Sequence, residues 1–138
     1  MKTNLQQKQT STNPNQTGLP LVDVIVDSIF DMKAKEVVRL DLSDLPESVC
    51  DHFIICEGTS TTQVKSIADN VMFEVKKATG EVALSSEGKD SAEWVLVDFV
   101  DVVVHVFLKE TRAFYQLEEL WADAKMLVYD DEGNLKEQ

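Results

Sequence analysis

The run AEWVLVDFVDVVVHVFLKETRAFYQLEELW, Ala92–Trp121, contains two strongly apolar strand-like segments followed by a helix. Six successive residues from Val102 (VVVHVF) are too apolar to alternate between a buried and an exposed face, so they predict a strand covered on both faces. The two segments are joined almost without a loop, which predicts a hairpin. This run therefore predicts a mixed or parallel sheet with helices packed on it.

Helices and further strands are predicted on either side of this run. Apolar residues recur at helical spacing from Leu21 to Met32, which predicts an amphipathic helix. A second helix has a start signal, because Ser60 can cap free backbone N–H groups while Gln63 reaches back. The expected order is a helix from Leu21, strands at Val37–Leu42 and His52–Cys56, a helix from Ser60 to Gly80, a strand at Val82–Leu84, the hairpin, and a helix from about Glu110.

The last expected helix would turn Phe114, Leu117, Leu120 and Trp121 towards the core. Together these elements predict a single α/β domain with a mixed sheet of about five strands flanked by helices. Residues 1–18 are rich in Gln, Asn, Thr and Ser, and we expect a disordered polar leader there. The domain is then expected over residues 19–123, and residues 124–138 are expected to form an acidic, mobile tail.

Composition narrows the possible functions. The chain has 138 residues, of which 43% are hydrophobic, so we expect a globular body with a real core. Its net charge of −12 disfavours direct binding to nucleic acid, because phosphate would repel it, but suits a basic protein partner. Two cysteines, Cys50 and Cys56, make no disulfide framework and are expected to be buried or half-buried free thiols. No apolar run predicts a membrane span or a signal peptide, so a cytoplasmic protein is expected.

Three groups of residues could carry chemistry, and each has a simpler interpretation. Gly58-Thr59-Ser60 precedes a helix and could cradle a phosphate, but helix capping explains the same residues. Asp98 and Asp101 could hold a metal ion, but they flank a turn and do not alternate along one strand. His105 lies within an apolar strand and is expected to be a hydrogen-bonded core residue. We expect no cofactor and no metal site.

The aromatic residues around the hairpin are the more informative set. Trp94 begins the hairpin, and Phe99 adjoins its turn. Exposed aromatic side chains are typical of binding hot spots, whereas buried ones belong to the core. For Trp94 and Phe99 the residues alone leave both interpretations open.

Two signatures cover most of the chain. The first is Asp51–Thr61 (DHFIICEGTST) with Gln63-Val64 and Ile67–Asp69; the second is Glu93–Phe99 and Asp101–Phe107, completed by Arg112, Phe114-Tyr115 and Leu117–Trp121. In this order and spacing, from about Leu21 to Asp123, the chain resembles the ribosomal silencing factor family (RsfS, also called Iojap). That resemblance implies a nucleotidyltransferase-like fold without a working catalytic set, and hence a protein that is not an enzyme.

The resemblance also implies a partner and a contact surface. Family members bind the large ribosomal subunit at its protein number fourteen, block joining of the small subunit, and repress translation when nutrients are short. Their contact surface matches Trp94 and Phe99 here, with Glu93 and Asp98 as polar neighbours. In one place the chain departs from the family, which commonly has Gly where Val100 stands, so a turn that needs a positive φ would be strained here.

Three alternatives stay open at this point. Asp98 and Asp101 could serve a magnesium-dependent nucleotidyltransferase. The protein could be an adaptor for some other basic partner. An exposed apolar hairpin could also pair with a second copy of the chain to form a homodimer.

Overall fold

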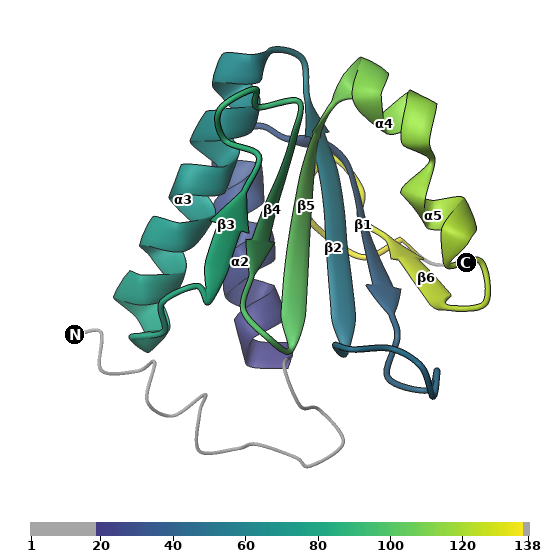
Figure 1. Cartoon of the computed structure of the whole chain (residues 1–138). Coiled ribbons are helices and arrows are strands. Elements are labelled where there is room, and N and C mark those ends of the chain that lie inside the picture. The colour runs from purple at the N-terminus through teal and green to yellow at the C-terminus, as the bar shows by residue number, and fades with distance from the viewer. Residues whose placement is uncertain (1–18, 137–138) are drawn as a thin grey trace.

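A six-stranded mixed sheet with the order β3-β4-β5-β2-β1-β6 forms the centre of the protein (Figure 1). The structure is a computed structural model and describes residues 19–136; the expected polar leader lies outside the described residues. The strands are β1 (Lys35–Asp41), β2 (His52–Gly58), β3 (Ser85–Glu87), β4 (Trp94–Asp98), β5 (Val102–Leu108) and β6 (Lys125–Val128).

The predicted central strand is confirmed. In β5 every residue from Val102 to Phe107 is buried, and in the neighbouring strand β2 all residues are buried. These two strands are parallel, whereas all other neighbours in the sheet are antiparallel. A strand that is covered on both faces has no polar side to show, which is why its sequence lacks alternation.

Two hydrophobic clusters lie on opposite faces of the sheet. The helices α2 (Leu19–Asp31) and α3 (Thr61–Thr79) cover one face, and Figure 1 shows α2 behind the strands. On the other face, two short helices follow β5, namely α4 (Lys109–Tyr115) and α5 (Leu117–Leu120), and Leu117 is buried there against the sheet. Both cysteines are buried and free, as predicted.

The strand predicted at Val82–Leu84 is wrong. The edge strand β3 lies further along, at Ser85–Glu87, and pairs with Leu96–Asp98 of β4. Continuing this register would pair Leu84 with Phe99, where the hairpin turn begins, so the pairing ends with the Leu84 N–H, which donates to the Asp98 carbonyl at 2.7 Å. Val82 and Leu84 are consequently exposed.

The prediction of a single last helix is also wrong, because the chain bends at Gln116. That residue has a left-handed backbone with φ 49°, which ends α4 and begins α5. The bend leaves Phe114 78% exposed and Leu120 76% exposed, although both were expected to face the core. Leu117 is buried as expected, and Trp121 packs edge-on against Phe53 with ring centroids 5.5 Å apart.

The expected mobile tail contains the sixth strand. Residues Lys125–Val128 form β6 and pair with β1, and Tyr129 forms a further bridge with Leu135. Tyr129 is buried, and its ring lies 6.4 Å from that of Phe30 on α2. The apolar run that begins at Met126 therefore completes the sheet, which has six strands and not about five.

The hairpin between β4 and β5 has the positive φ that the family's usual glycine at position 100 made a possibility. Val100 has φ 78°, so a β-branched residue occupies a conformation that favours glycine. The Asp101 N–H donates to the Phe99 carbonyl at 3.0 Å, which makes Val100 the centre of a three-residue turn. The turn is closed by the Phe99 N–H, which donates to the Val102 carbonyl at 2.9 Å.

Candidate partner-binding surface

Trp94 is the central side chain of the predicted surface. It is the first residue of β4, and its half-buried ring stacks on Phe107 of β5 with centroids 4.7 Å apart and planes 29° apart. The ring of Tyr115, at the end of α4, lies 5.0 Å away on a tilted plane. An aromatic side chain held between two other rings loses little freedom when a partner covers it.

His105 fixes the indole from a third side. The Trp94 Nε1–H donates to His105 Nδ1 at 3.1 Å, so Nδ1 is unprotonated and the neutral ring carries its proton on Nε2. Burial lowers the pKa of His105 to about 4, and the side chain is 4% exposed. The prediction of a hydrogen-bonded core histidine is confirmed, and it serves to orient Trp94.

Phe99 does not share this surface, which corrects the expectation that it could be exposed. It is 5% exposed and belongs to the cluster under α2 and α3, on the other face of the sheet from Trp94. Because side chains alternate along a strand, residues five positions apart point to opposite faces. The apolar side chain that the turn does present is Val100, which is 56% exposed.

The two acidic neighbours have different roles. Asp98 lies on the same face of β4 as Trp94 and is half-buried, and its carboxylate accepts the Val100 N–H at 2.7 Å. Glu93 is exposed, while its main-chain carbonyl accepts the Leu108 N–H at 2.8 Å. Glu93 thus offers a solvent-facing carboxylate beside Trp94, whereas Asp98 mainly holds the turn.

Two aromatic residues of α4 extend the surface beyond the hairpin. Phe114 is exposed, Tyr115 is 50% exposed, and their rings meet edge-on with centroids 5.0 Å apart. Together with Trp94 they form what we call the aromatic surface (Trp94, Phe114 and Tyr115). Phe114 was expected in the core, and only the bend at Gln116 reveals its exposure; Tyr115 could have been found from its place in the same aromatic set.

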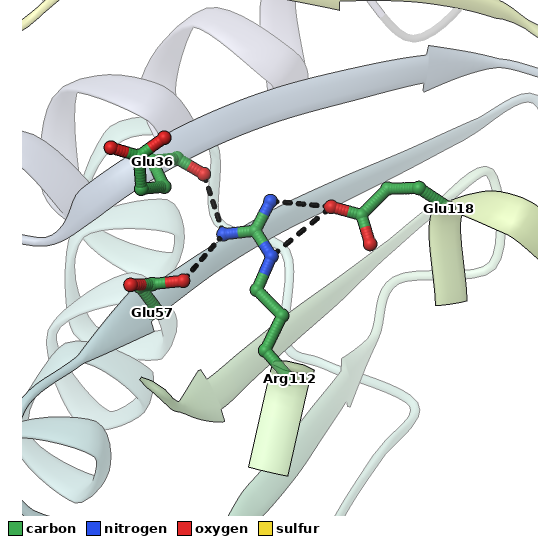
Figure 2. Close-up of polar contacts among 4 residues, drawn as sticks. All are labelled: Glu36, Glu57, Arg112 and Glu118. Carbon is green, nitrogen blue, oxygen red and sulfur yellow. Dashed lines mark hydrogen bonds and ion pairs between the residues drawn. The ribbon is translucent and has the colours of Figure 1, made fainter. Parts of the chain in front are cut away.

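Arg112 is a residue of α4, and its side chain lies in a network of acidic residues (Figure 2). Its guanidinium donates to the carboxylates of Glu57, at 3.2 Å, and Glu118, at 2.6 Å and 3.1 Å. It also donates to the main-chain carbonyl of Glu36 at 2.6 Å. Burial raises the pKa of Glu57, and the neighbouring Arg112 charge opposes that shift.

The residues considered for other chemistry have structural roles. Ser60 Oγ accepts the Gln63 N–H at 3.1 Å, which confirms the predicted cap, and the Gln63 side chain accepts the Thr59 N–H at 2.8 Å. These contacts account for the Gly58-Thr59-Ser60 turn without a phosphate. Asp101 uses its main-chain carbonyl to accept the N–H groups of Asp51 and His52. Over residues 19–136, no three His, Cys, Asp or Glu side chains gather where they could hold a metal ion.

None of the helices between residues 19 and 136 combines the length and the apolar character needed to cross a bilayer.

Comparison with known proteins agrees with this architecture. The family described as "Ribosomal silencing factor during starvation" matches residues 15–138. A ribosomal silencing factor from Haemophilus influenzae is 38% identical over 104 residues, which is 75% of this chain and 100% of that protein. A crystal structure of a protein from Chromobacterium violaceum superposes with a TM-score of 0.72 at 39% identity, covering 75% of this chain and 85% of that one. A mouse protein named "Mitochondrial assembly of ribosomal large subunit protein 1" is 31% identical over 114 residues, which is 80% of this chain and 48% of that protein.

The fold and these relatives define a small α/β regulator of translation. The chain belongs to the ribosomal silencing factor (RsfS) family.

Proposed function

We propose that this protein binds the large ribosomal subunit through its ribosomal protein number fourteen and sterically blocks joining of the small subunit. It would thereby repress translation in the cytoplasm when nutrients are limiting. Membership of the RsfS family supports a role on the ribosome. Such a protein acts by occupying a surface, so it needs no turnover.

The observation that carries the proposal is the constrained exposure of Trp94. Its indole is held by Phe107, Tyr115 and His105, yet it is only half-buried. Preorganised, partly exposed tryptophan is among the commonest hot-spot residues at protein interfaces. Glu93 and Asp98 would supply the acidic rim of this site, while Phe99 would support it from the core by holding the turn.

The charge of the chain supports a basic partner. A net charge of −12 favours encounter with a basic ribosomal protein and disfavours direct contact with bare RNA phosphate. The apolar anchor then provides the specificity that charge alone cannot provide.

An enzyme is the alternative, and a titration separates the two. A nucleotidyltransferase would use Asp98 and Asp101 with magnesium, but the Asp98 carboxylate is engaged in the hairpin turn. Isothermal titration of the protein with magnesium and nucleoside triphosphates should give no heat of binding. Saturable, magnesium-dependent binding would favour the enzyme.

The direct test is co-sedimentation with purified large subunits, small subunits and joined ribosomes. We expect the protein to sediment with large subunits alone and to lower the yield of joined ribosomes when the two subunits are mixed. Sedimentation with none of them, with the protein shown to be folded, would contradict the proposal and leave the enzyme and the adaptor as equal alternatives. Velocity sedimentation of the free protein would show whether it forms a homodimer.

Trp94→Ala tests the anchor. We expect this variant to bind large subunits more weakly by about 2 kcal/mol, roughly 30-fold, as a central aromatic hot spot does. Phe73→Ala is a matched control, because Phe73 is an exposed aromatic residue on α3, which covers the other face of the sheet. Equal affinity of the folded Trp94 variant and wild type would remove Trp94 from the interface.

A further inference from the structure

Helix α4 carries two residues of the aromatic surface but buries none of its own residues. A surface helix is normally held by an apolar stripe that packs on the core. Seven residues are also too few to form a stable helix in isolation. Something other than hydrophobic burial therefore has to hold Phe114 and Tyr115 in place.

The Arg112 network provides that hold. Arg112 has an 11% exposed side chain, and its guanidinium contacts three separate elements: Glu36 on β1, Glu57 on β2 and Glu118 on α5 (Figure 2). A planar guanidinium with several fixed donors defines both position and orientation, which a lysine ammonium cannot do. The Arg112 guanidinium therefore fixes α4 relative to the sheet and to α5.

The main chain on the sheet side is shaped for this contact. Glu36 has a positive φ of 51° and lies where the register of β1 against β2 shifts, so its carbonyl is turned away from the ladder and accepts from Arg112. Such a conformation costs energy in a residue other than glycine. The hydrogen bond from Arg112 to the Glu36 carbonyl offsets part of that cost.

The position of Tyr115 depends on the same contacts. Tyr115 lies three residues after Arg112, so the two side chains leave neighbouring positions on the helix surface. Its ring lies 5.0 Å from Trp94 and 5.0 Å from Phe114. If α4 moved on the sheet, the contact between Tyr115 and Trp94 would be lost, and Phe114, which is on the same helix, would move away from Trp94 together with Tyr115.

We propose that Arg112 is a positioning residue for partner binding: it holds α4 so that Phe114 and Tyr115 join Trp94 in one surface for a basic protein segment. The inference rests on the proposed function and extends its contact surface from the hairpin to α4. The exposed carboxylate of Glu110 lies four residues before Phe114 on α4, so the two side chains leave neighbouring positions on the helix surface. Aromatic faces bordered by carboxylates suit arginine and lysine side chains, which gain from cation–π contact.

A double-mutant cycle on binding to large subunits tests this role. Tyr115→Ala should weaken binding about tenfold and Arg112→Lys about fivefold, as interface anchors and their supports do. Because Arg112 acts through α4, the double variant should bind no more than about twofold more weakly than Tyr115→Ala alone. Multiplied effects, or an Arg112 variant with wild-type affinity, would overturn the inference.

A spectroscopic measurement reports the positioning directly. The chain has two tryptophans, so Trp121→Phe leaves Trp94 as the only one. In that background, Arg112→Lys should shift the Trp94 emission to longer wavelength, because the displaced Tyr115 ring exposes the indole to water. An unchanged emission maximum would contradict the proposal even if binding fell.

Two further variants separate positioning from loss of stability. Glu118→Gln keeps the shape of the network, weakens one contact of Arg112, and should give smaller changes of the same sign in emission and affinity. Val71→Ala removes buried volume in α3, under the opposite face, and should lower stability while leaving Trp94 emission and binding unchanged. If wild type binds no subunit, the proposed function fails, and the emission shift still decides whether Arg112 positions α4.

Discussion

Val100 is a valine at a position whose backbone favours glycine. Its φ of 78° places the β-branched side chain in a region that costs most residues energy, while the hydrogen bonds of the turn hold it there. The Asp98 carboxylate contributes to this hold through the Val100 N–H. The hairpin thus stores strain at its tip, at the opposite end of β4 from Trp94.

We predict that Val100→Gly stabilises the protein by about 1 kcal/mol, since relief of strain exceeds the added entropy of the unfolded chain. Urea unfolding measures the change. Val82→Gly is a control, because Val82 is also exposed but has no positive φ. Its replacement should either leave the stability unchanged or decrease it. Equal effects of the two substitutions would show that the turn is not strained.

His105 makes stability depend on pH. Its pKa falls from an ordinary 6.5 to about 4 in the folded protein because the ring is buried. The unfolded chain therefore binds a proton that the folded chain rejects, so stability is fully present above pH 6.5 and declines as the pH falls towards 4. In the folded state Nδ1 accepts the Trp94 N–H, so protonation of Nδ1 would also break this hydrogen bond and bring two N–H groups together.

We predict that the titration of His105 alone lowers the free energy of unfolding by about 2 kcal/mol when the pH falls from 7 to 5. His105→Asn keeps an acceptor for Trp94 but does not titrate, so its loss of stability over that range should be smaller by the same amount. Urea unfolding of both proteins at the two pH values gives the comparison. Parallel losses would mean that His105 is already protonated or is not buried.

At the scale of elements, β6 shows how a short apolar run can complete a sheet. Tyr129 follows this strand, is buried beside Phe30 of α2, and donates its N–H to Val37 at 3.0 Å. It joins the last strand both to β1 and to the first described helix. The C-terminal segment should therefore contribute to the stability of the domain.

We predict that Tyr129→Ala lowers the free energy of unfolding by about 3 kcal/mol, as removal of a buried aromatic ring does. Met126→Ala on the same segment is the control, since Met126 is exposed and its loss should cost under about 1 kcal/mol. A Tyr129 variant as stable as wild type would show that the tail is not docked.

At the scale of the whole molecule, charge and the aromatic surface should act on different rate constants. The net charge of −12 attracts a basic partner over distances that salt screens. The stacked Trp94 acts only after contact. Attraction should therefore govern association, and the aromatic anchor should govern dissociation.

We predict that raising the salt concentration from 50 to 500 mM slows association with large subunits by about tenfold and changes dissociation little. Trp94→Ala should instead speed dissociation and change association little. Biolayer interferometry with immobilised protein measures both rates. Glu93→Lys should slow association more than Glu81→Lys, which changes an exposed carboxylate beyond the far end of α3. Association that does not respond to salt would remove charge from the recognition step.

The amino-acid sequence alone determined the α/β class, the buried central strand and the cap at Ser60. These features follow from periodicity and from contacts within a few residues, which is why they could be predicted. The family resemblance likewise followed from local signatures, and the comparisons confirm it.

Only the tertiary structure decided the bend at Gln116, the docking of β6 and the burial of Phe99. Each depends on a partner that is distant in sequence, as when Arg112 meets the Glu36 carbonyl 76 residues away. A helical pattern shows that Phe114 and Leu117 share a face. It does not show that contacts of the Arg112 guanidinium, and not a buried apolar stripe, hold α4 on the sheet. Long-range partners are chosen by the packing of the whole chain, and so they decided which aromatic residues are exposed.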